Sequence, residues 1–341
     1  MNIYCAPMEG LTLFPFRQVH HDFFPGISKY YTPFLVANQT LHFKKKEIRE
    51  LLPDNNKGIC VVPQVLTNKP DEFLWAVRTI QGYGYTEINL NLGCPSPTVV
   101  TRGRGAGMLA DTENLDRFFE AVFNEMTAAP ETYQARISVK TRTGMEEHCP
   151  KELMEIYNRY PICELIIHPR RRVDQYQGTP DWDVFEEMLE KSEHPVCYNG
   201  EINTVEDHQR LKERFPDLQA VMIGRGLIRD PALAHKIEKY NGQGYMEHPQ
   251  ENAGKSEDSA DYSDKSTDFT DTRLLWSYQK ELCHRYAEAI DGERDVVAKM
   301  KEVWSFMADL FPENKKGLKQ IRKAKTYEQY EEGVRRIMEE A

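Results

Sequence analysis

The stretch EINLNLGCPSPTVVTRGRGAG (residues 87–107) starts as an apolar strand, and a loop rich in glycine follows it. Cys94 stands where that strand ends, between a glycine and a proline. A cysteine that only fills a core needs no such surroundings, whereas a reactive thiol held above a bound ligand does. Cys94 is therefore the first candidate functional residue.

Short apolar or β-branched runs recur along the first 240 residues, and amphipathic helical patterns follow most of them. Predicted strands cover 3–6, 29–35, 60–66, 87–91, 136–142, 164–168, 195–199 and 220–224. Predicted helices cover 70–82, 112–127, 151–159, 181–191, 204–214 and 230–240. Alternation of this kind implies parallel pairing, and eight such units are typical of an α/β fold of the (β/α)8 TIM-barrel type. A doubly wound open sheet is the alternative.

The remaining sequence predicts two further segments after a barrel domain at 1–240. Residues 241–272 are polar and acidic, and they hold too little apolar surface to offset their ordering entropy, so we expect a flexible linker or insertion. Residues 273–341 show helical spacing at 274–290, 295–311, 315–325 and 326–340. This pattern predicts a separate C-terminal all-α helical bundle.

The formal net charge of -10, taken alone, argues against a nucleic-acid partner. Its uneven distribution along the chain weakens this argument. Residues 246–272 hold eight acidic and two basic residues, a net of -6, whereas 273–341 have a net of +1. The segment KKGLKQIRKAK (315–325) has six basic residues and no acidic one. Such a segment is either a solvated helix face or a surface for RNA phosphates, with Lys299 and Lys301 as a second patch.

Seven scattered cysteines without a CxxC pair fit a reducing compartment and give no zinc-ligand spacing. Cys5, Cys60, Cys163 and Cys197 lie in predicted strands and are expected to be small core residues. The sequence shows no signal peptide and no run approaching the ~18 apolar residues of a membrane span. We expect a cytoplasmic monomer that binds neither a metal nor a membrane.

Polar or special residues gather at the C-terminal ends of the predicted strands, where TIM barrels hold their chemistry. The two glycine turns YNGEINT and IGRGLIRDP follow strands seven and eight, a common phosphate site, where Arg225 adds a charge. Lys140 lies in a strand suited to the barrel interior and needs an anionic partner, either a salt bridge or a ligand such as a reduced flavin. The residues at the strand ends are Ala6–Gly10, Gln64, Asn91, Cys94, Lys140, Arg142, His168, Asn199–Glu201 and Gly224–Gly226.

The segments APMEGLT, NLNLGCPSP, SVKTRTG, YNGEI and IGRGL occur in an order and at spacings that resemble tRNA-dihydrouridine synthases. The resemblance covers nearly the whole chain except 241–272. It implies an FMN-containing barrel with a helical tRNA-binding domain, in which NADPH reduces FMN and FMN reduces a uridine of tRNA.

The resemblance also implies roles for individual residues. Cys94 aligns with the catalytic proton donor, and Asn91 and Arg142 align with positions that contact the uracil. The residues expected around FMN are Pro7, Met8, Glu9, Gln64, Lys140 and His168, with Asn199, Gly200, Glu201, Gly224 and Arg225 at its phosphate. One segment departs from the family: HPRRR (168–172) replaces HGRTR, so that Arg171 is an additional arginine, either solvated or placed for RNA phosphate.

These roles explain the position of Cys94. Saturating the uracil C5–C6 bond requires a hydride at C6, which reduced FMN supplies, and a proton at C5 from the opposite face. A thiol with a pKa of about 8.5 is mostly protonated at neutral pH and can act as this acid. The glycine loop at 103–107 is expected to close over the base once RNA arrives.

Three other functions remain open from the sequence. An FMN oxidoreductase of the dihydropyrimidine or dihydroorotate dehydrogenase type explains the barrel and the cysteine but not the appended helices. A flavin-bound RNA-binding module without catalysis leaves Cys94 and Lys140 unexplained. A flavin-free aldolase-type barrel would use Lys140 as a Schiff base.

Overall fold

The computed structural model describes residues 1–242 and 272–340. The predicted segment 241–272 therefore lies almost entirely outside the described residues. The chain divides into two compact units, of which the first comprises residues 1–18, 27–202 and 209–225 and the second 19–26, 203–208 and 226–341. The predicted domain boundaries at 240 and 272 remain predictions.

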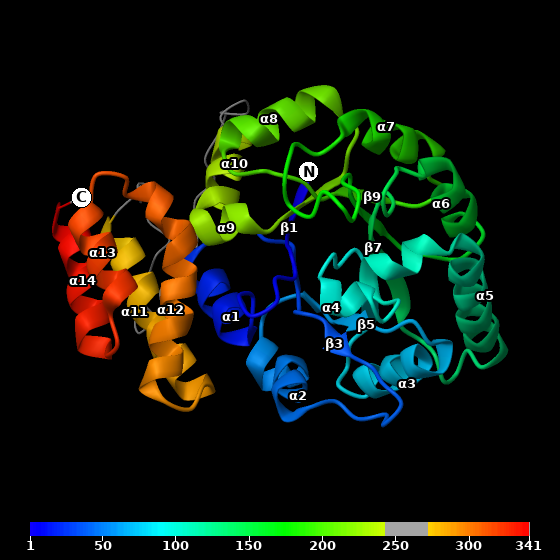
Figure 1. Ribbon diagram of the computed structural model, residues 1–341, viewed down its shortest axis with the longest axis horizontal. Helices are drawn as coiled ribbons and strands as arrows, with labels where there is room; N and C mark the ends of the chain where they lie inside the picture. Colours follow the sequence, from blue (N-terminus) through cyan, green and yellow to red (C-terminus); the bar gives the residue numbers. More distant parts are fainter. Residues whose placement is uncertain (243–271, 341) are drawn as a thin grey trace, which may run out of the picture. The chain divides into compact units, whose positions relative to one another are not determined.

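The first unit is built on one parallel sheet of ten strand segments (Figure 1). Their order in the sheet is β3-β5-β6-β7-β8-β9-β10-β1-β2-β4, and every printed pair is parallel. The strands are β1 (Asn2–Cys5), β2 (Lys29–Tyr31), β3 (Leu35–Val36), β4 (Val61–Val62), β5 (Gln64–Leu66), β6 (Glu87–Leu92), β7 (Arg136–Arg142), β8 (Leu165–His168), β9 (Val196–Tyr198) and β10 (Ala220–Ile223).

The sheet closes into a barrel. β3, at one end of the strand order, follows β2, which lies near the other end, and β4, at that other end, continues into β5 beside β3. Pro63 alone separates β4 from β5. Proline has no N–H to donate to the ladder, so it interrupts what is otherwise one strand. β4 pairs with β2 while β5 pairs with β3 and β6, and β1 pairs with β10. The ten segments therefore form eight barrel positions, and the predicted TIM-barrel fold is confirmed.

Helices α3, α5, α6 and α7 cover the outside of the strands in Figure 1. They carry apolar stripes that bury residues such as Phe73, Phe119 and Phe185. The sequence predicted these helices to within two residues but missed α1, α2, α4 and α9. The helices of the chain are α1 (Phe14–Phe23), α2 (Lys45–Leu51), α3 (Pro70–Gln81), α4 (Pro97–Val100), α5 (Thr112–Ala128), α6 (Pro150–Tyr157), α7 (Trp182–Lys191), α8 (Val205–Arg214), α9 (Arg225–Arg229), α10 (Leu233–Gly242), α11 (Thr272–Ala289), α12 (Glu293–Met307), α13 (Lys315–Lys323) and α14 (Tyr327–Glu340), with 3₁₀ turns η1 (Pro53–Asn56), η2 (Gly105–Ala110) and η3 (Ala308–Leu310).

Side chains fill the barrel interior rather than leaving a pore. Tyr4, Tyr31, Ile166, Cys197 and Met222 form one buried cluster there. Cys5 and Cys197 are buried, as expected for small core residues. The same expectation is wrong for Cys60, which is exposed just before β4, and for Cys163, which is half-buried before β8.

Four of the helices in the second unit, α11 to α14, match the helical segments predicted after residue 273. A buried hydrogen-bond chain joins α11, α12 and α14: Trp304 donates to Tyr330 over 2.9 Å, and Tyr330 donates to Gln279 over 3.0 Å. Helices α13 and α14 approach closely at glycine. A Cβ on Gly317 would lie 2.5 Å from the Ile337 side chain, so only glycine fits.

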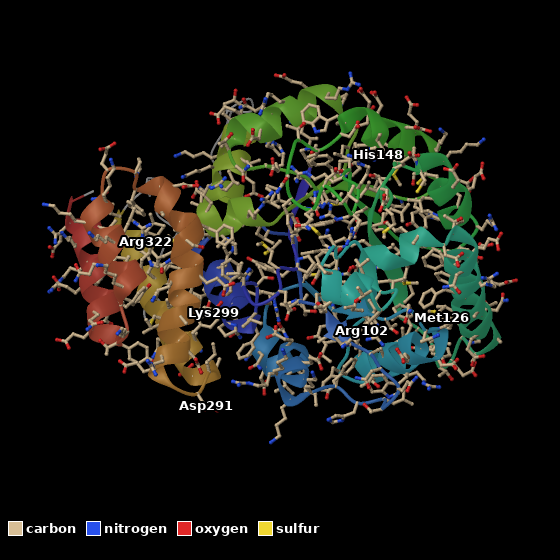
Figure 2. The ribbon with its side chains drawn as sticks, viewed as in Figure 1. Arg102, Met126, His148, Asp291, Lys299 and Arg322 are labelled. Carbon is tan, nitrogen blue, oxygen red and sulfur yellow. The ribbon has the colours of Figure 1, made fainter. Side chains whose placement is uncertain are left out.

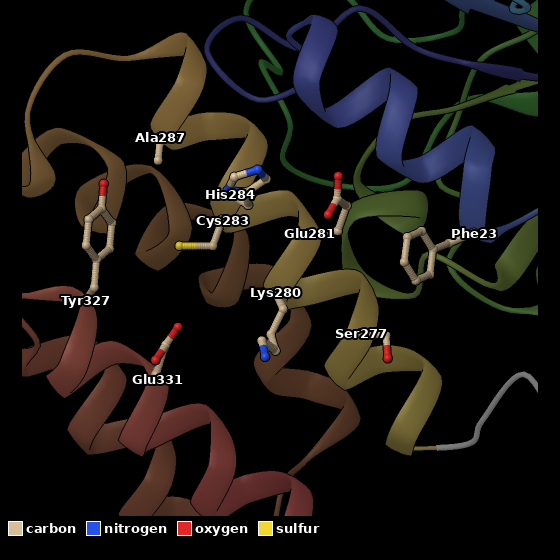
Figure 3. A pocket seen from close by; sticks show the side chains of 9 residues that line it. All are labelled: Phe23, Ser277, Lys280, Glu281, Cys283, His284, Ala287, Tyr327 and Glu331. Carbon is tan, nitrogen blue, oxygen red and sulfur yellow. The ribbon is translucent and has the colours of Figure 1, made fainter. Parts of the chain in front are cut away.

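A pocket of about 650 Å³ lies in this unit, and none of the predicted site residues lines it (Figure 3). The Cys283 thiol faces this pocket, and burial raises its pKa to about 11, which keeps it neutral. Among the described residues, no helix has both the length and the apolar character needed to cross a bilayer.

Candidate active site at the barrel mouth

Strand register places the predicted residues side by side at the C-terminal ends of β5 to β8. Asn91 on β6 lies opposite Lys140 on β7, and Arg142 on β7 lies opposite His168 at the end of β8. Gln64 on β5 is in register with Asn89 on β6. Residues in register on adjacent parallel strands project to the same face of the sheet. The mouth therefore collects these side chains without any loop rearrangement.

A chain of buried side-chain amides connects β7 to the Cys94 turn. Asn89 donates to the Ser138 hydroxyl over 3.0 Å and accepts a hydrogen bond from Gln64 Nε2 over 2.8 Å. Gln64 Oε1 in turn accepts from Asn91 Nδ2 over 2.7 Å. Asn89, Gln64 and Ser138 have no exposed surface, and Asn91 is only 7% exposed. We refer to Ser138, Asn89, Gln64 and Asn91 as the amide chain.

The amide chain ends on the backbone of the proposed proton donor. Asn91 Oδ1 accepts the N–H groups of Gly93 and Cys94, at 3.0 and 2.9 Å. This Asx-type cap fixes the turn that carries the thiol. Asn91 was predicted to contact the uracil, but its carbonyl oxygen is already committed to the turn.

The glycine loop packs against Cys94. The Ala106 N–H donates to the Cys94 carbonyl over 3.1 Å, and a Cβ on Gly105 would lie 2.9 Å from that oxygen. Gly105 also has a φ of +57°, which disfavours any other residue. An ion pair of 3.3 Å between Arg104 and the buried Glu72 ties the loop to α3. The expectation that this loop closes over the base once RNA arrives stays a prediction.

The Cys94 thiol is mostly buried, and burial raises its pKa above the usual value. A backbone hydrogen bond from Ser96 and the cations Arg142 and Lys140 oppose this shift, while Glu9 adds to it. The raised pKa keeps the thiol protonated at neutral pH. A neutral thiol is the form that can donate a proton.

Lys140 is the least compensated charge at the mouth. Burial and, second, the neighbouring Arg142 lower its pKa to about 8. Within the described residues, no carboxylate or carbonyl accepts a hydrogen bond from its ammonium group. A mostly buried cation without an acceptor is costly, and this favours an electron-rich or anionic ligand at this point. The alternative expectation, a salt bridge across the barrel, finds no partner among the described residues.

Arg142 is tied to the backbone of three loop positions. It donates to the carbonyl oxygens of Gly93, Arg171 and Gln175, at 2.8, 2.9 and 2.7 Å. The exposed ring of Tyr176 lies 5.4 Å from its guanidinium. Arg142 was predicted to contact the uracil, and these bonds show that it also holds together the loops after β6 and β8.

The predicted phosphate site combines glycine turns with a charged cluster. Glu201 pairs with Arg225 at 2.5 Å and with the buried Arg170 at 3.2 Å. The Arg170 Nε atom is buried and has no acceptor in the described part of the chain. A Cβ on Gly200 would collide with the Tyr198 hydroxyl at 2.0 Å. The turns thus leave backbone N–H groups and one arginine donor for an anion.

His168 and Asn199 complete this side of the mouth. Burial, followed by the nearby Arg142, Lys140 and Arg170, holds the pKa of His168 well below its usual value, so the imidazole is neutral. Asn199 donates to the Met222 carbonyl over 2.8 Å, which links the ends of β9 and β10. Gly224 lies beside Met8, because a Cβ there would be 3.2 Å from the Met8 sulfur.

The loop after β1, which contains Pro7, Met8 and Glu9, is supported by hydrogen bonds to residues that follow it in the chain. Thr12 Oγ1 accepts the Met8 N–H over 2.8 Å, and the Thr12 carbonyl accepts from Arg17 over 2.9 Å. Arg17 is fully buried and pairs with Glu50 at 2.7 Å. These contacts fix the conformation of the loop.

Arg171, the additional arginine of the HPRRR segment, pairs with Asp174 at 2.7 Å and donates to the Glu146 carbonyl. Arg171 therefore contacts its own loop and the loop after β7, and its contact with RNA phosphate stays a prediction.

Sequence reasoning missed Asn89, Tyr176 and the Glu72–Arg104 pair. Asn89 precedes Asn91 by two residues, and this period-two spacing on a strand was a signal that both face inward. For Tyr176 and the Glu72–Arg104 pair no local pattern exists, since their contacts cross between elements.

The family model for dihydrouridine synthase matches residues 4–334. The chain belongs to the dihydrouridine synthase family. The match spans the barrel and the C-terminal helices, so a reductase of free pyrimidines is not favoured.

Curated relatives in this family carry the same activity in their names. A probable tRNA-dihydrouridine synthase of Helicobacter pylori strain J99 is 28% identical, over 84% of this chain and 83% of the relative. tRNA-dihydrouridine synthase B of Pasteurella multocida is 28% identical over 70% and 69%, respectively. tRNA-dihydrouridine(16) synthase of Neisseria meningitidis is 25% identical over 71% and 73%.

Solved structures with a similar fold are more distant. A 2-naphthoyl-CoA reductase complex aligns with a TM-score of 0.52 at 11% identity, over 70% of this chain and 50% of that one. Morphinone reductase aligns with a TM-score of 0.50 at 12% identity, over 70% and 86%. These likenesses support the fold assignment of the dihydrouridine synthase chain.

Proposed function

We propose that this chain is an FMN-dependent tRNA-dihydrouridine synthase that uses NADPH to reduce the C5–C6 bond of uridines in tRNA. The observation that carries the proposal is the juxtaposition of Cys94 with the uncompensated Lys140, in a chain that belongs to this family. The residues at the mouth fit FMN: Lys140 lacks an acceptor, Arg170 Nε is buried without a partner, and the glycine turns leave no room for side chains.

In this proposal Lys140, Gln64 and the neutral His168 face the ring of FMN. The turns at Asn199–Glu201 and Gly224–Arg225 hold its phosphate, with Arg170 and Arg225 compensating the charge of Glu201. The bound cofactor supplies a hydride to C6 of the uracil.

Cys94 supplies the proton to C5. The S–H bond breaks, a C5–H bond forms, and the sulfur keeps the electron pair as a thiolate. The Ser96 N–H, Arg142 and Lys140 all favour this thiolate, because each of them lowers the Cys94 pKa. Hydride and proton together add the two hydrogens of dihydrouridine, and solvent restores the thiol.

The test replaces Cys94 and measures each half-reaction separately. Cys94→Ala is expected to bind FMN and to accept electrons from NADPH at the wild-type rate, and to form no dihydrouridine on unmodified tRNA. Cys149→Ala is the matched control, because Cys149 is a half-buried thiol whose pKa burial also raises, to about 11. Wild-type dihydrouridine formation by Cys94→Ala would refute the proton-donor role.

Binding of the folded RNA requires contacts beyond the mouth, since extruding a base costs a few kcal/mol. Helix α13 exposes its cations, and no ion pair involves them among the described residues; Arg322 on it is labelled in Figure 2. In the second proposed patch, Lys299 pairs with Glu302 at 2.6 Å and Lys301 donates to the Ala324 carbonyl. This patch is therefore less available than α13.

Neutralising the cations of α13 is expected to lower the slope of log Kd for tRNA against log salt, because binding then releases several fewer counterions. The variant combines Lys315→Ser, Lys316→Ser, Lys319→Ser, Arg322→Ser and Lys323→Ser. The control removes three cations already paired on outer barrel helices: Arg117, Lys151 and Lys191. An unchanged slope in the α13 variant removes this helix from the RNA interface.

A further inference from the structure

Residues 37–44, which we call the rim loop, connect β3 to α2 and are closed at their base by one carboxylate. Glu47 Oε1 accepts the Val36 N–H over 3.1 Å, and Glu47 Oε2 accepts the Lys44 N–H over 2.7 Å. Glu47 is buried. One side chain therefore fixes both ends of the loop.

The rim loop is also rigid at its tip. Asn38 Oδ1 accepts the backbone N–H of Thr40 over 2.9 Å, and the Asn38 carbonyl accepts the Leu41 N–H over 3.0 Å. Phe43 is buried, with its ring 4.7 Å from that of Trp75 on α3. These contacts give the rim loop a defined conformation.

Leu41 stands at this tip in an unfavourable state. Its φ of +47° places it in the left-handed region, and its side chain is 47% exposed. Glycine or asparagine adopts this conformation at less cost, and an exposed leucine gains little from folding. The one other described non-glycine residue with positive φ, Gln175, supplies a carbonyl to Arg142. The Leu41 N–H closes the turn onto the Asn38 carbonyl, but a glycine or asparagine would do the same, so an exposed leucine at this strained position points to an external contact.

Three lysines follow the tip directly. Lys44, Lys45 and Lys46 are exposed, and no ion pair involves them in the described part of the chain. Three adjacent unpaired cations repel one another, so an anionic partner stabilises them. The rim loop thus presents one apolar side chain beside a positive cluster, which is the combination that nucleic acids bind.

Strand topology places the rim loop on the same edge of the barrel as Cys94. The loop leaves the C-terminal end of β3, which pairs with β5, and β5 pairs with β6, after which Cys94 follows. The neighbouring loops are also linked, because Asn68 after β5 donates to the Arg102 carbonyl in the glycine loop over 3.1 Å.

We propose that the rim loop contacts the RNA substrate at the barrel mouth. Leu41 packs against the nucleobases left unstacked when the target uridine enters the barrel, and Lys44, Lys45 and Lys46 contact the flanking phosphates. The inference rests on the proposed function and adds an RNA-binding element on the barrel unit itself.

The first test uses the strain at Leu41. Leu41→Gly and Leu41→Asn relieve the left-handed conformation, so the melting temperature should stay the same or rise. Both variants should nevertheless lose about tenfold in kcat/KM on unmodified tRNA, since burying a leucine side chain against a base is worth roughly that much. Reduction by NADPH should be unchanged. Leu52→Ala is the control, because Leu52 is another exposed leucine, 37% exposed, that follows α2.

A structural role for Leu41 would give the opposite pattern, with reduced stability and unchanged kcat/KM, and would overturn the proposal. The second test combines Lys44→Ser, Lys45→Ser and Lys46→Ser. The slope of log Kd for tRNA against log salt should fall by about two to three. Lys57→Ser, an exposed lysine before β4 at the opposite end of the barrel, should change this slope less than one-third as much.

The two proposals fail separately. If the wild-type chain binds tRNA but forms no dihydrouridine, the proposed function fails while the binding tests still decide on the rim loop. If the triple variant keeps the wild-type salt slope, or loses binding to anionic vesicles or a protein partner instead, the rim loop is not an RNA contact.

Discussion

The substitution Asn89→Ala removes the central member of the amide chain. Asn89 holds Gln64 so that its carbonyl faces Asn91, and Asn91 then turns its own carbonyl toward the Cys94 turn. Without Asn89 the Gln64 amide is free to reverse. Asn91 would have to reverse as well and direct its NH₂ group at the N–H groups of Gly93 and Cys94. Donor would then face donor, and the turn would open.

The cost follows from the burial of the groups left behind. Gln64 Nε2 loses its acceptor and the Ser138 hydroxyl loses its donor, and both residues are fully buried. Each unsatisfied buried group costs about 1–3 kcal/mol, so the two groups together should lower the free energy of unfolding of Asn89→Ala by about 2–6 kcal/mol. Asn89→Asp should cost less, because burial keeps its carboxyl group protonated, so that the C=O still accepts from Gln64 and the O–H still donates to Ser138.

The assay separates loss of stability from release of Cys94. Urea unfolding gives the free energy, and iodoacetamide labelling of the native protein, quantified on the Cys94 peptide, gives the accessibility of the thiol. Labelling should be several-fold faster in Asn89→Ala and close to wild type in Asn89→Asp. Ile88→Ala is the matched control: Ile88 is the buried preceding residue on β6, with its side chain on the opposite face of the strand, and its truncation also costs about 2–5 kcal/mol. Equal labelling rates in Asn89→Ala and Ile88→Ala would refute positioning through the amide chain.

Three further outcomes are expected. Lys29→Met leaves the buried Glu87 and Glu164 without their shared cation and should lower the free energy of unfolding by about 3 kcal/mol in urea titrations. Lys140 has a folded pKa of about 8 and an unfolded pKa of about 10.4, so the unfolded state binds more protons between these values. Stability of the wild type relative to Lys140→Met should therefore rise from pH 8 to pH 10 and stay level below pH 8. Gly105→Ala, which forces a side chain against the backbone of the proposed proton donor, should slow dihydrouridine formation more than it weakens FMN binding, as fluorescence titration of the flavin would show.

The barrel was predictable because its evidence is local. Each strand carries its own apolar run, and the glycine turns after β9 and β10 are readable in five or six residues. The division of the predicted strand at 60–66 was also readable, since Pro63 interrupts the ladder. The exposure of Cys60 was not, because it depends on which end of the strand lacks a covering helix.

The connections within the site could not be predicted in the same way. That Arg142 ties three loops together depends on loop conformations that no strand pattern fixes. The Arg104–Glu72 pair joins positions 32 residues apart, and Glu47 bridges Val36 and Lys44 across the rim loop. Sequence reasoning selected the residues that bear the chemistry, whereas their supports require register and tertiary contacts.

One physical cause, burial, shifts the pKa values of Cys94 and Lys140 in opposite directions. Burial at the mouth disfavours charge, so it raises the pKa of the thiol and lowers that of the ammonium, and both groups move toward neutrality. The neutral thiol is the form needed to donate a proton, while an electron-rich partner beside Lys140 stabilises the charged form of its ammonium group. An anionic ligand at Lys140 therefore raises its pKa again, and its binding must weaken as the pH rises above about 8. The same restored cation then favours the thiolate left after proton transfer, so that ligand binding prepares Cys94 to act as the acid.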